Sequence, residues 1–387
     1  MNILHIIPNL KKGGAERLAI DICLQLSKTK THNVVLVYLE NLNEYEEFTK
    51  ELTTYLIESR VIPSITSRNT VNVDDLNKFI KNFKPDIIHT HLFEAEFVSR
   101  FCIYPKASWF SHVHDNMIQF TNWSWSNVTK IAFTNWYEKK ILFKNYQING
   151  GTHFIAISKH ADSFIKSVQT EFPVTLLHNA INVKRFQKPI VSQNFSLDQS
   201  LTNDQLHKSN NKSHDPKLIS LINIGSFVPK KNQTFLIDVI LELNKRGIQT
   251  NCYFLGDGPL REEVENRARI CGISNQCQFL GNVNNVEEYL WQSDIYVHTA
   301  TYEPLGLVLI EAMAAGLPVV TADGGGNQDL MINGKNGFLI EKHDPEIFSD
   351  RILQVYQNQE MKEFNTEFAH QFDIESYCQR LLEIYQN

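Results

Sequence analysis

Short apolar runs rich in β-branched residues alternate with longer amphipathic segments along most of this 387-residue chain. A short apolar run bounded by turn residues is typical of a buried strand, and apolar residues repeating every three or four positions are typical of a helix. Strands that alternate with helices favour parallel βαβ units, in which ligands bind beyond the carboxyl ends of the strands. The pattern predicts strands at 3–7, 34–39, 85–91, 154–158, 174–177, 218–224, 251–255, 277–280, 294–298, 319–321 and 337–340. It predicts helices at 15–28, 74–83, 127–146, 264–271, 286–292, 306–315, 345–357 and 374–385, and a further helix that starts at Lys159 and is capped by Ser158.

A polar stretch interrupts this alternation near the middle of the chain. Residues 188–216 are dominated by Asn, Gln, Ser and Lys and hold few large apolar side chains. Such a segment cannot bury enough apolar surface to offset the entropy cost of ordering it. We therefore expect an α/β class fold with two domains, at residues 1–187 and 217–372, joined by a polar linker at 188–216.

The segment from Thr299 to Val320 places a polar turn ahead of a short helix that begins near Gly306. The first backbone N–H groups of a helix lack partners within it and carry partial positive charge, which suits a phosphate. Glu303 and Glu311 flank this helix start, and a carboxylate can accept hydrogen bonds from two sugar hydroxyls. The spacing fits a sugar nucleotide, although a solvated turn carboxylate and a helix-dipole partner would give the same pattern.

Two further strand ends carry residues that suit a phosphate. The first predicted strand is followed by Gly13 and Gly14 and then by a helix, a layout that can bring backbone N–H groups to a phosphate. The strand at 218–224 is followed by GSFVPKKN, in which Lys230 and Lys231 can neutralise phosphate oxygens. Paired glycines and surface lysines are common in βα turns, so neither feature is specific by itself.

The stretch EPLGLVLIEAMAAGLPVV, which begins at Glu303, carries two Glu residues with seven residues between them. It resembles the donor-site signature of the retaining group-one glycosyltransferases of family four, which have the GT-B fold. In that family the first Glu contacts the transferred sugar and the second contacts the ribose, roles that the resemblance assigns to Glu303 and Glu311. The N–H groups of Leu305, Gly306 and Leu307 would then bind the diphosphate.

Other segments resemble the same family. Gly13 and Gly14 match its Gly-Gly pair, which lies close to the donor diphosphate. His114, followed by Asp115, matches a strand-end His that faces the sugar and the leaving phosphate. Lys231 matches the Lys of the diphosphate site. By this resemblance Glu303 orients the sugar ring, Lys231 stabilises the leaving diphosphate, and His114 acts from the opposite domain.

This sequence departs from the family pattern at two places. Ser226 stands where the family has an Arg, which removes a bidentate phosphate contact from the predicted donor site. Lys230 is our candidate to replace that contact. Residues 178–182, HNAIN, differ from the usual Asn-Gly-Ile-Asp at two of its four positions.

The resemblance covers nearly the whole chain outside the linker. It implies two Rossmann-like doubly wound domains that face each other across a cleft, with a C-terminal helix at 373–387 packing back on the first domain. It also implies a hexosyltransferase that moves a sugar, with retention, from a nucleotide-diphosphate donor to a glycan or lipid-linked acceptor in surface polysaccharide or glycoconjugate synthesis. We favour a UDP-sugar donor, and we expect no cofactor, no metal and no nucleic-acid partner.

Cysteine usage and hydropathy favour a cytoplasmic protein. Lys and Arg outnumber Asp and Glu by 21 to 17 in residues 1–186, whereas the acids lead by 26 to 16 in the remainder, which gives the net charge of −6. Six Cys without metal-type spacing indicate reduced thiols, and no signal peptide or bilayer-spanning run is evident. The basic, aromatic-rich segment 127–146 suits either a core helix or a helix on a membrane surface. Because many members of the family use lipid-linked acceptors, we expect peripheral contact of the N-terminal domain with the inner face of the cell membrane.

Three alternatives stay open. His89, His91, His112 and His114 all lie at predicted strand ends and suggest a metal site, but no Cys-bearing or carboxylate-rich pattern accompanies them. Ser226 and the altered HNAIN segment fit a catalytically silent, glycosyltransferase-like binding subunit of a glycosylation complex. A sugar-nucleotide epimerase on the same double fold would need acid and base residues placed for water attack, and we identify none in the sequence.

Overall fold

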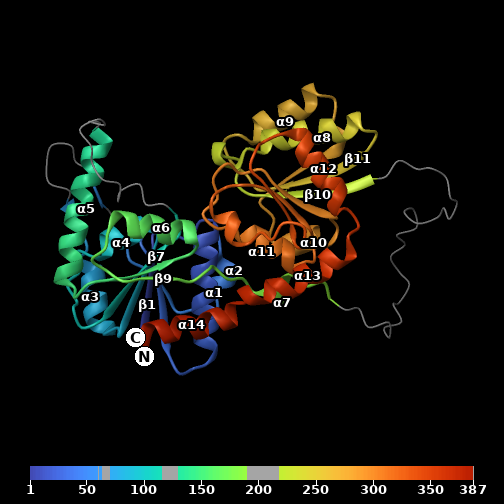
Figure 1. Ribbon diagram of the computed structural model, residues 1–387. Helices are drawn as coiled ribbons and strands as arrows, with labels where there is room; N and C mark the ends of the chain where they lie inside the picture. Colours follow the sequence, from blue (N-terminus) through green and yellow to red (C-terminus); the bar gives the residue numbers. More distant parts are fainter. Residues whose placement is uncertain (60, 63–69, 116–129, 190–217, 387) are drawn as a thin grey trace.

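The computed structural model describes every residue except 60, 63–69, 116–129, 190–217 and 387 (Figure 1). The described residues form two α/β units, one coloured blue to green and the other yellow to red in Figure 1. The predicted linker at 188–216 lies, apart from its first two residues, outside the described residues.

The first domain is built on a parallel sheet of seven strands in the order β3-β2-β1-β6-β7-β8-β9. The strands of this sheet are β1 (Asn2–Ile7), β2 (Asn33–Tyr38), β3 (Thr54–Leu56), β6 (Ile87–His91), β7 (Ser108–Val113), β8 (His153–Ala156) and β9 (Val174–Leu176). Its helices are α1 (Gly14–Lys28), α2 (Glu46–Thr49), α3 (Asp74–Phe83), α4 (Leu92–Ser99), α5 (Lys130–Ile148), α6 (Lys159–Val168) and α7 (Val183–Phe186). A separate antiparallel pair consists of β4 (Val61–Ile62) and β5 (Thr70–Val71).

The second domain has a six-stranded parallel sheet in the order β12-β11-β10-β13-β14-β15. Its strands are β10 (Leu218–Ile224), β11 (Gln249–Leu255), β12 (Cys277–Gly281), β13 (Ile295–His298), β14 (Val319–Ala322) and β15 (Gly337–Ile340). Its helices are α8 (Gln233–Lys245), α9 (Arg261–Ile270), α10 (Val286–Trp291), α11 (Leu307–Ala314), α12 (Pro345–Val355) and α13 (Gln359–Ala369), with 3-10 turns that include η2 (Pro229–Lys231) and η4 (Gly326–Asp329).

The last helix, α14 (Ile374–Gln386), leaves the second domain and packs beside α1 under the first (Figure 1). The Tyr385 hydroxyl at its end lies 2.6 Å from Nδ1 of His89 in β6. Two doubly wound domains with a returning C-terminal helix are what we expected, and this prediction of the fold is confirmed.

The topology of each sheet determines where a ligand can bind. From β1 the chain moves outward to β2 on one side, whereas from β6 it moves outward to β7 on the other. The connections therefore diverge between β1 and β6, and in the same way between β10 and β13 in the second sheet. Divergent connections leave a crevice at the carboxyl ends of the central strands. These crevices hold Gly13 and Gly14 in one domain and Lys231 and Glu303 in the other.

The hydrophobic pattern did not reveal helices α4, α8 and α13. Helix α4 buries five consecutive residues, Ala95 to Ser99, and α8 buries residues around most of its circumference. Helices enclosed by other elements lose the one-sided apolar stripe by which a surface helix is recognised. Helix α13 begins four residues after α12 ends, beyond the predicted helix at 345–357, in a segment for which no element was predicted.

A buried ion pair joins α4 to the core of the first domain. The side chains of Arg100 and Glu96 are 0% and 1% exposed, and Arg100 Nε lies 2.9 Å from Glu96 Oε1. The guanidinium also donates to Thr152 Oγ1 at 2.6 Å and to the Gly151 carbonyl at 3.0 Å. Its carbon Cζ lies 4.3 Å from the centre of the Trp109 ring. The charge of Arg100 is therefore matched by one carboxylate and several neutral acceptors.

Removing one member of this pair should destabilise the first domain strongly. We expect Arg100→Met to lower the free energy of unfolding by about 3–5 kcal/mol, because it leaves the Glu96 carboxylate buried without its cation. The double variant Arg100→Met/Glu96→Leu should recover much of that loss. Urea unfolding of the three proteins measures both values, and a double variant no more stable than the single would contradict this account.

Candidate active site

Helix α11 begins at Leu307, with Gly306 as its N-cap, and it contacts α7 of the first domain. A Cβ atom on Gly306 would lie 2.7 Å from Leu309 Cδ1 and 3.2 Å from Glu303 Cγ, so a side chain there would require both side chains to move. A Cβ atom on Gly14 would lie 3.3 Å from Leu307 Cδ1. Gly14, the first residue of α1, and the start of α11 therefore meet across the domain interface, and the absence of a side chain on Gly14 permits this approach.

A glycine turn after β14 holds the backbone on either side of Glu303. The N–H of Glu303 donates to the Gly324 carbonyl at 2.7 Å, and its carbonyl accepts from the Gly326 N–H at 2.9 Å. A Cβ atom on Gly326 would lie 1.6 Å from the Pro304 carbonyl oxygen, so no other residue fits there. The glycine turn therefore positions Glu303.

The Glu303 carboxylate sits in a compact polar cluster in the second domain. Lys231 Nζ forms an ion pair with Glu303 Oε2, and Nε2 of His298 lies 3.0 Å from the same oxygen. The Tyr296 hydroxyl lies 3.0 Å from the other ring nitrogen of His298. Sequence analysis missed His298 and Tyr296, although both lie on β13, the strand that leads directly into the Glu303 turn.

These contacts keep Glu303 ionised despite its burial. Burial by itself raises the pKa of this carboxyl, but the Lys231 ammonium and the hydrogen bond from His298 outweigh it and lower the pKa to about 2. Burial also lowers the pKa of His298, an effect that Glu303 partly opposes. A neutral His298 that donates from Nε2 to the carboxylate and accepts at Nδ1 from Tyr296 satisfies all of these contacts.

Glu311 lies in a different environment, at the contact between α11, α1 and α7. It lines a small pocket together with Arg17, Asp21 and Arg185. Arg17 Nε forms an ion pair with Asp21 Oδ2 at 2.9 Å. Desolvation raises the pKa of Glu311 to about 7, and the attraction of Arg185 and Arg17 only partly opposes it. The two acids of the motif therefore differ in their titration, one near pH 2 and the other near neutrality.

Asp115 connects the first domain to the turn before α11. Its carboxylate accepts a hydrogen bond from the Tyr302 hydroxyl, and it lies 3.7 Å from Lys230 Nζ. Tyr302 precedes Glu303 in the chain, and Asp115 follows His114. The structure thus brings Asp115, next to His114, into contact with Tyr302, next to Glu303, across the domain interface.

The position at which the family has an Arg and this chain has Ser226 makes few side-chain contacts. Ser226 is exposed, and its carbonyl accepts from the Gln233 amide at 3.0 Å. Lys230 is 46% exposed and lies beside Asp115 rather than beside Ser226. Its position at the cleft is compatible with a phosphate contact, and its role stays a prediction.

His114 lies in a buried row of histidines that sequence analysis recognised only in part. Its side chain is buried, and Nε2 lies 3.1 Å from Nδ1 of His91. The expectation that His89 and His112 lie at strand ends was wrong, since both lie inside their strands, β6 and β7. His5 of β1, which we had not considered, belongs to the same row because parallel pairing places it opposite His89.

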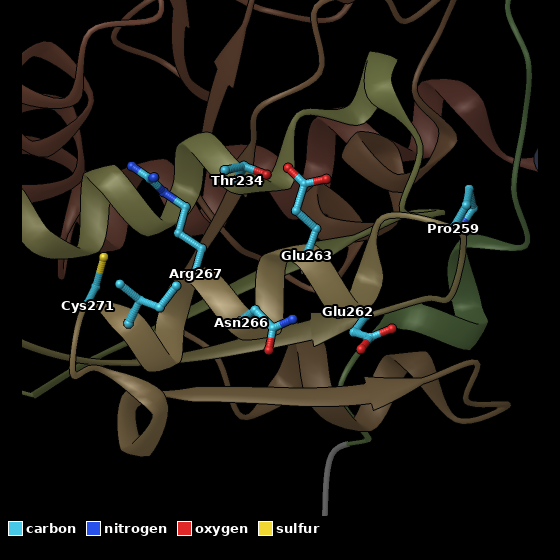
Figure 2. Close-up of a pocket in the computed structure, with 8 residues that line it drawn as sticks. Thr234, Pro259, Glu262, Glu263, Asn266, Arg267 and Cys271 are labelled. Atoms are coloured by element: carbon cyan, nitrogen blue, oxygen red, sulfur yellow. The ribbon is translucent and has the colours of Figure 1, made fainter.

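A larger hollow lies on the outer face of the second domain, between α8 and α9 (Figure 2). It contains none of the residues predicted for the donor site, and Figure 2 shows most of its labelled side chains on α9, with Thr234 on α8. We place the site at the interface of the domains, where the helix start and the charged cluster lie. The outer hollow is lined by Thr234, Pro259, Glu262, Glu263, Asn266, Arg267, Ile270 and Cys271.

Comparison with known proteins gives the family to which this fold belongs. The model for glycosyl transferases group 1 matches residues 202–372, and the model for Glycosyltransferase Family 4 matches residues 12–185. The two models together span both domains. The chain belongs to the group-one glycosyltransferases and has the GT-B fold.

Individual relatives agree with this assignment. EpsF of Bacillus subtilis (strain 168), a protein named as a glycosyltransferase, is 27% identical over 83% of this chain and 79% of its own length. The lipopolysaccharide core biosynthesis glycosyltransferase LpsE of Rhizobium meliloti (strain 1021) is 30% identical over 39% of this chain and 43% of its own. The structure of Anabaena Alr3699/HepE in complex with UDP-glucose superimposes with a TM-score of 0.75 at 19% identity, over 100% of this chain and 99% of that one.

Within the part of the chain that the structure describes, each helix is too short or too polar to span a bilayer.

The raised pKa of Glu311 predicts how stability depends on pH. The folded-state pKa of about 7 exceeds the ordinary value of 4.5, so Glu311 loses its proton earlier in the unfolded chain and stability falls as pH rises across this window. Glu311→Gln cannot ionise and should therefore be more stable than the natural protein at pH 8, by about 1–3 kcal/mol, and similar to it at pH 5. Urea unfolding at the two pH values tests this, and an equal difference at both would contradict it.

Proposed function

We propose that this protein is a retaining hexosyltransferase that transfers a sugar from a UDP-sugar to a glycan or lipid-linked acceptor in surface polysaccharide or glycoconjugate synthesis. The observation that carries the proposal is the position of Lys231 and the start of α11 at the carboxyl end of the second sheet, facing Gly14. A cation, unpaired helix N–H groups and a close glycine backbone together suit a diphosphate. UDP-glucose bound by the Anabaena protein of the same fold supports the choice of nucleotide.

In this proposal the Lys231–Glu303 pair changes partners when the donor binds. The diphosphate would attract Lys231, and Glu303 would then accept a hydrogen bond from a sugar hydroxyl. His298 would keep the carboxylate in place, because its hydrogen bond to Oε2 does not depend on Lys231. Glu311, beside α1 and α7, would bind the ribose hydroxyls.

The rate enhancement would come from stabilising charge on the leaving diphosphate. Lys231 and the N–H groups of Leu305, Gly306 and Leu307 are positioned before the reaction starts, and such preorganised donors act strongly where water is excluded. We propose that these groups, with Lys230, meet the phosphate charge without a divalent metal. His114 would add a hydrogen bond from the first domain.

Helix α5 supports peripheral contact with the inner face of a membrane. Four of its exposed residues, Tyr137, Lys140, Lys144 and Ile148, recur at a spacing of three and four and therefore lie along one side of the helix. A stripe that combines Lys with an aromatic and an aliphatic residue suits a surface of anionic lipid. The acceptor would then be presented to the first domain from the membrane.

A catalytically silent binding subunit is the second candidate, because Ser226 stands at the Arg position. The two candidates differ in turnover and not in fold. Thermal unfolding in the presence of UDP-, GDP- and ADP-sugars identifies the donor, since a ligand that binds only the folded state raises the melting temperature. Sugar release or transfer from the stabilising donor then indicates the enzyme. Binding without turnover, for every acceptor tested, would favour the subunit.

Substitutions at the ion pair should separate nucleotide binding from sugar positioning. We expect Lys231→Ala and Glu303→Ala each to reduce transfer by more than about tenfold. Lys231→Ala should also weaken UDP binding, whereas Glu303→Ala should leave it nearly unchanged, because of these two side chains only that of Lys231 would contact phosphate.

Calorimetry with UDP and a transfer assay measure the two effects. The control is Lys245→Ala, since this lysine is 74% exposed and pairs with Glu242 away from the cleft. Circular dichroism checks that each variant is folded. Unchanged turnover in both Lys231→Ala and Glu303→Ala would remove this assignment of the site.

A further inference from the structure

Five buried histidines form one row on the face of the first sheet that α14 covers. In register, His5 pairs with His89 and His91 pairs with His112, and alternate residues of a strand share a face. The rings contact one another, with centroids 4.2 Å apart for His112 and His114 and 5.4 Å apart for His91 and His114. Every member is at most 8% exposed.

Three of these rings form a hydrogen-bonded chain. Nδ1 of His5 lies 2.9 Å from Nε2 of His91, and Nδ1 of His91 lies 3.1 Å from Nε2 of His114. The two outer nitrogens, Nε2 of His5 and Nδ1 of His114, have no partner among the described residues. The chain therefore has one end in the core and the other at His114, beside the cleft.

The protons on this chain can be counted. Burial lowers the pKa of His5 and of His114 to about 3 and that of His91 well below its ordinary value, so all three rings are neutral and each carries one N–H. Two hydrogen bonds in series then permit only two arrangements. Either every N–H points from His5 toward His114, or every N–H points the other way.

The two arrangements differ in what they leave unpaired in the core. Pointing toward His114 leaves a lone pair at Nε2 of His5 and an N–H on Nδ1 of His114, which also has no partner among the described residues. The reverse leaves the N–H at Nε2 of His5 and the lone pair at His114, so each arrangement has one unpaired N–H, the costlier of the two groups to bury. His5 is 0% exposed, whereas His114 is 8% exposed and precedes Asp115, which contacts Tyr302 at the domain interface. The N–H costs less at His114, the end nearer to solvent and to a bound substrate, and this favours the first arrangement.

We propose that His5 and His91 are positioning residues that hold His114 in the tautomer with its proton on Nδ1, so that His114 offers a hydrogen-bond donor to an oxygen of the bound substrate. The identity of that oxygen, on the sugar or on the leaving phosphate, rests on the proposed function. A donor held before the reaction stabilises developing negative charge without reorganisation. No proton needs to be transferred from His114 in this role.

A bound metal is the competing explanation of the same cluster. The two triads His5–His89–His91 and His91–His112–His114 each have ligand atoms within 4.8 Å of one another. His91 belongs to both triads, and both of its ring nitrogens are already hydrogen bonded. A metal at either triad would have to break at least one of these bonds, which is why we favour the hydrogen-bonded chain.

The tautomer can be measured on the resting protein, with no substrate present. Long-range ¹H–¹⁵N spectra of protein labelled at the histidine ring nitrogens distinguish Nδ1–H from Nε2–H, and the spectrum of His114→Gln assigns the His114 signal. We expect a neutral His114 with its proton on Nδ1. A proton on Nε2, or stoichiometric zinc in the purified protein that these rings bind, would overturn the proposal.

Variants then test whether the chain matters for transfer. His91→Phe keeps a ring but removes both hydrogen bonds, and we expect His114 to shift toward Nε2–H and kcat to fall about tenfold, with a smaller change in donor KM. His112→Phe is the matched control, because His112 is as deeply buried and contacts His114, yet neither of its ring nitrogens has a partner among the described residues. It should keep both the tautomer and the turnover.

The outcomes separate the two proposals. Equal losses in His91→Phe and His112→Phe would show that only packing matters and would overturn the role of the chain. If both variants fail to fold, the spectrum of the natural protein decides. A proton on Nδ1 in a protein that transfers no sugar would instead refute the proposed function and leave the hydrogen-bonded chain intact.

Discussion

The arrangement of the cleft depends on one buried carboxylate that must remain charged. Desolvation opposes ionisation of Glu303, and Lys231 with His298 overcomes it, so the acid has a pKa of about 2. A charge held in this way needs a rigid backbone, which the turn from Gly324 to Gly326 supplies through two hydrogen bonds to Glu303. In the proposed function, the same lysine that stabilises Glu303 would bind the diphosphate of the donor. Donor binding would then draw Lys231 away from Glu303, its partner in the resting protein.

The second constraint is the meeting of the two domains. Asp115 accepts from Tyr302 on one side of the cleft, and on the other Asp329 accepts from the Lys159 N–H at 2.6 Å and lies 3.0 Å from His178. These contacts are polar and made by side chains, so they can be exchanged for water or ligand at modest cost. The strands behind them are apolar and buried on both faces, as parallel sheets require. The interface thus combines these polar contacts with apolar packing, since Leu18 of α1 and Leu307 of α11 belong to one buried cluster.

Much of the fold could be predicted because each βα unit is encoded locally. The strand, the turn and the helix around Gly306 are contiguous, and the helix begins where the glycine and the preceding polar turn predicted it. Helix α4 could not be predicted from periodicity because it is enclosed on several sides. In the site, Glu303, Lys231 and Glu311 were found from motif and resemblance. His298 was missed because a His in a strand carries no local sign of the carboxylate that it will meet.

The sequence by itself determined the order of strands and helices, the start of α11 at Gly306 and the pair of acids Glu303 and Glu311. All of these depend on residues close together in the chain. Only the tertiary structure decided the charge states and hydrogen bonds. Glu303 and Glu311 are the same residue type on one motif, yet burial beside different cations places their pKa values near 2 and near 7. His5 and His91 are 86 residues apart and meet because β1 and β6 pair in one register. Desolvation and register are properties of the packed sheet, and a linear pattern does not contain them.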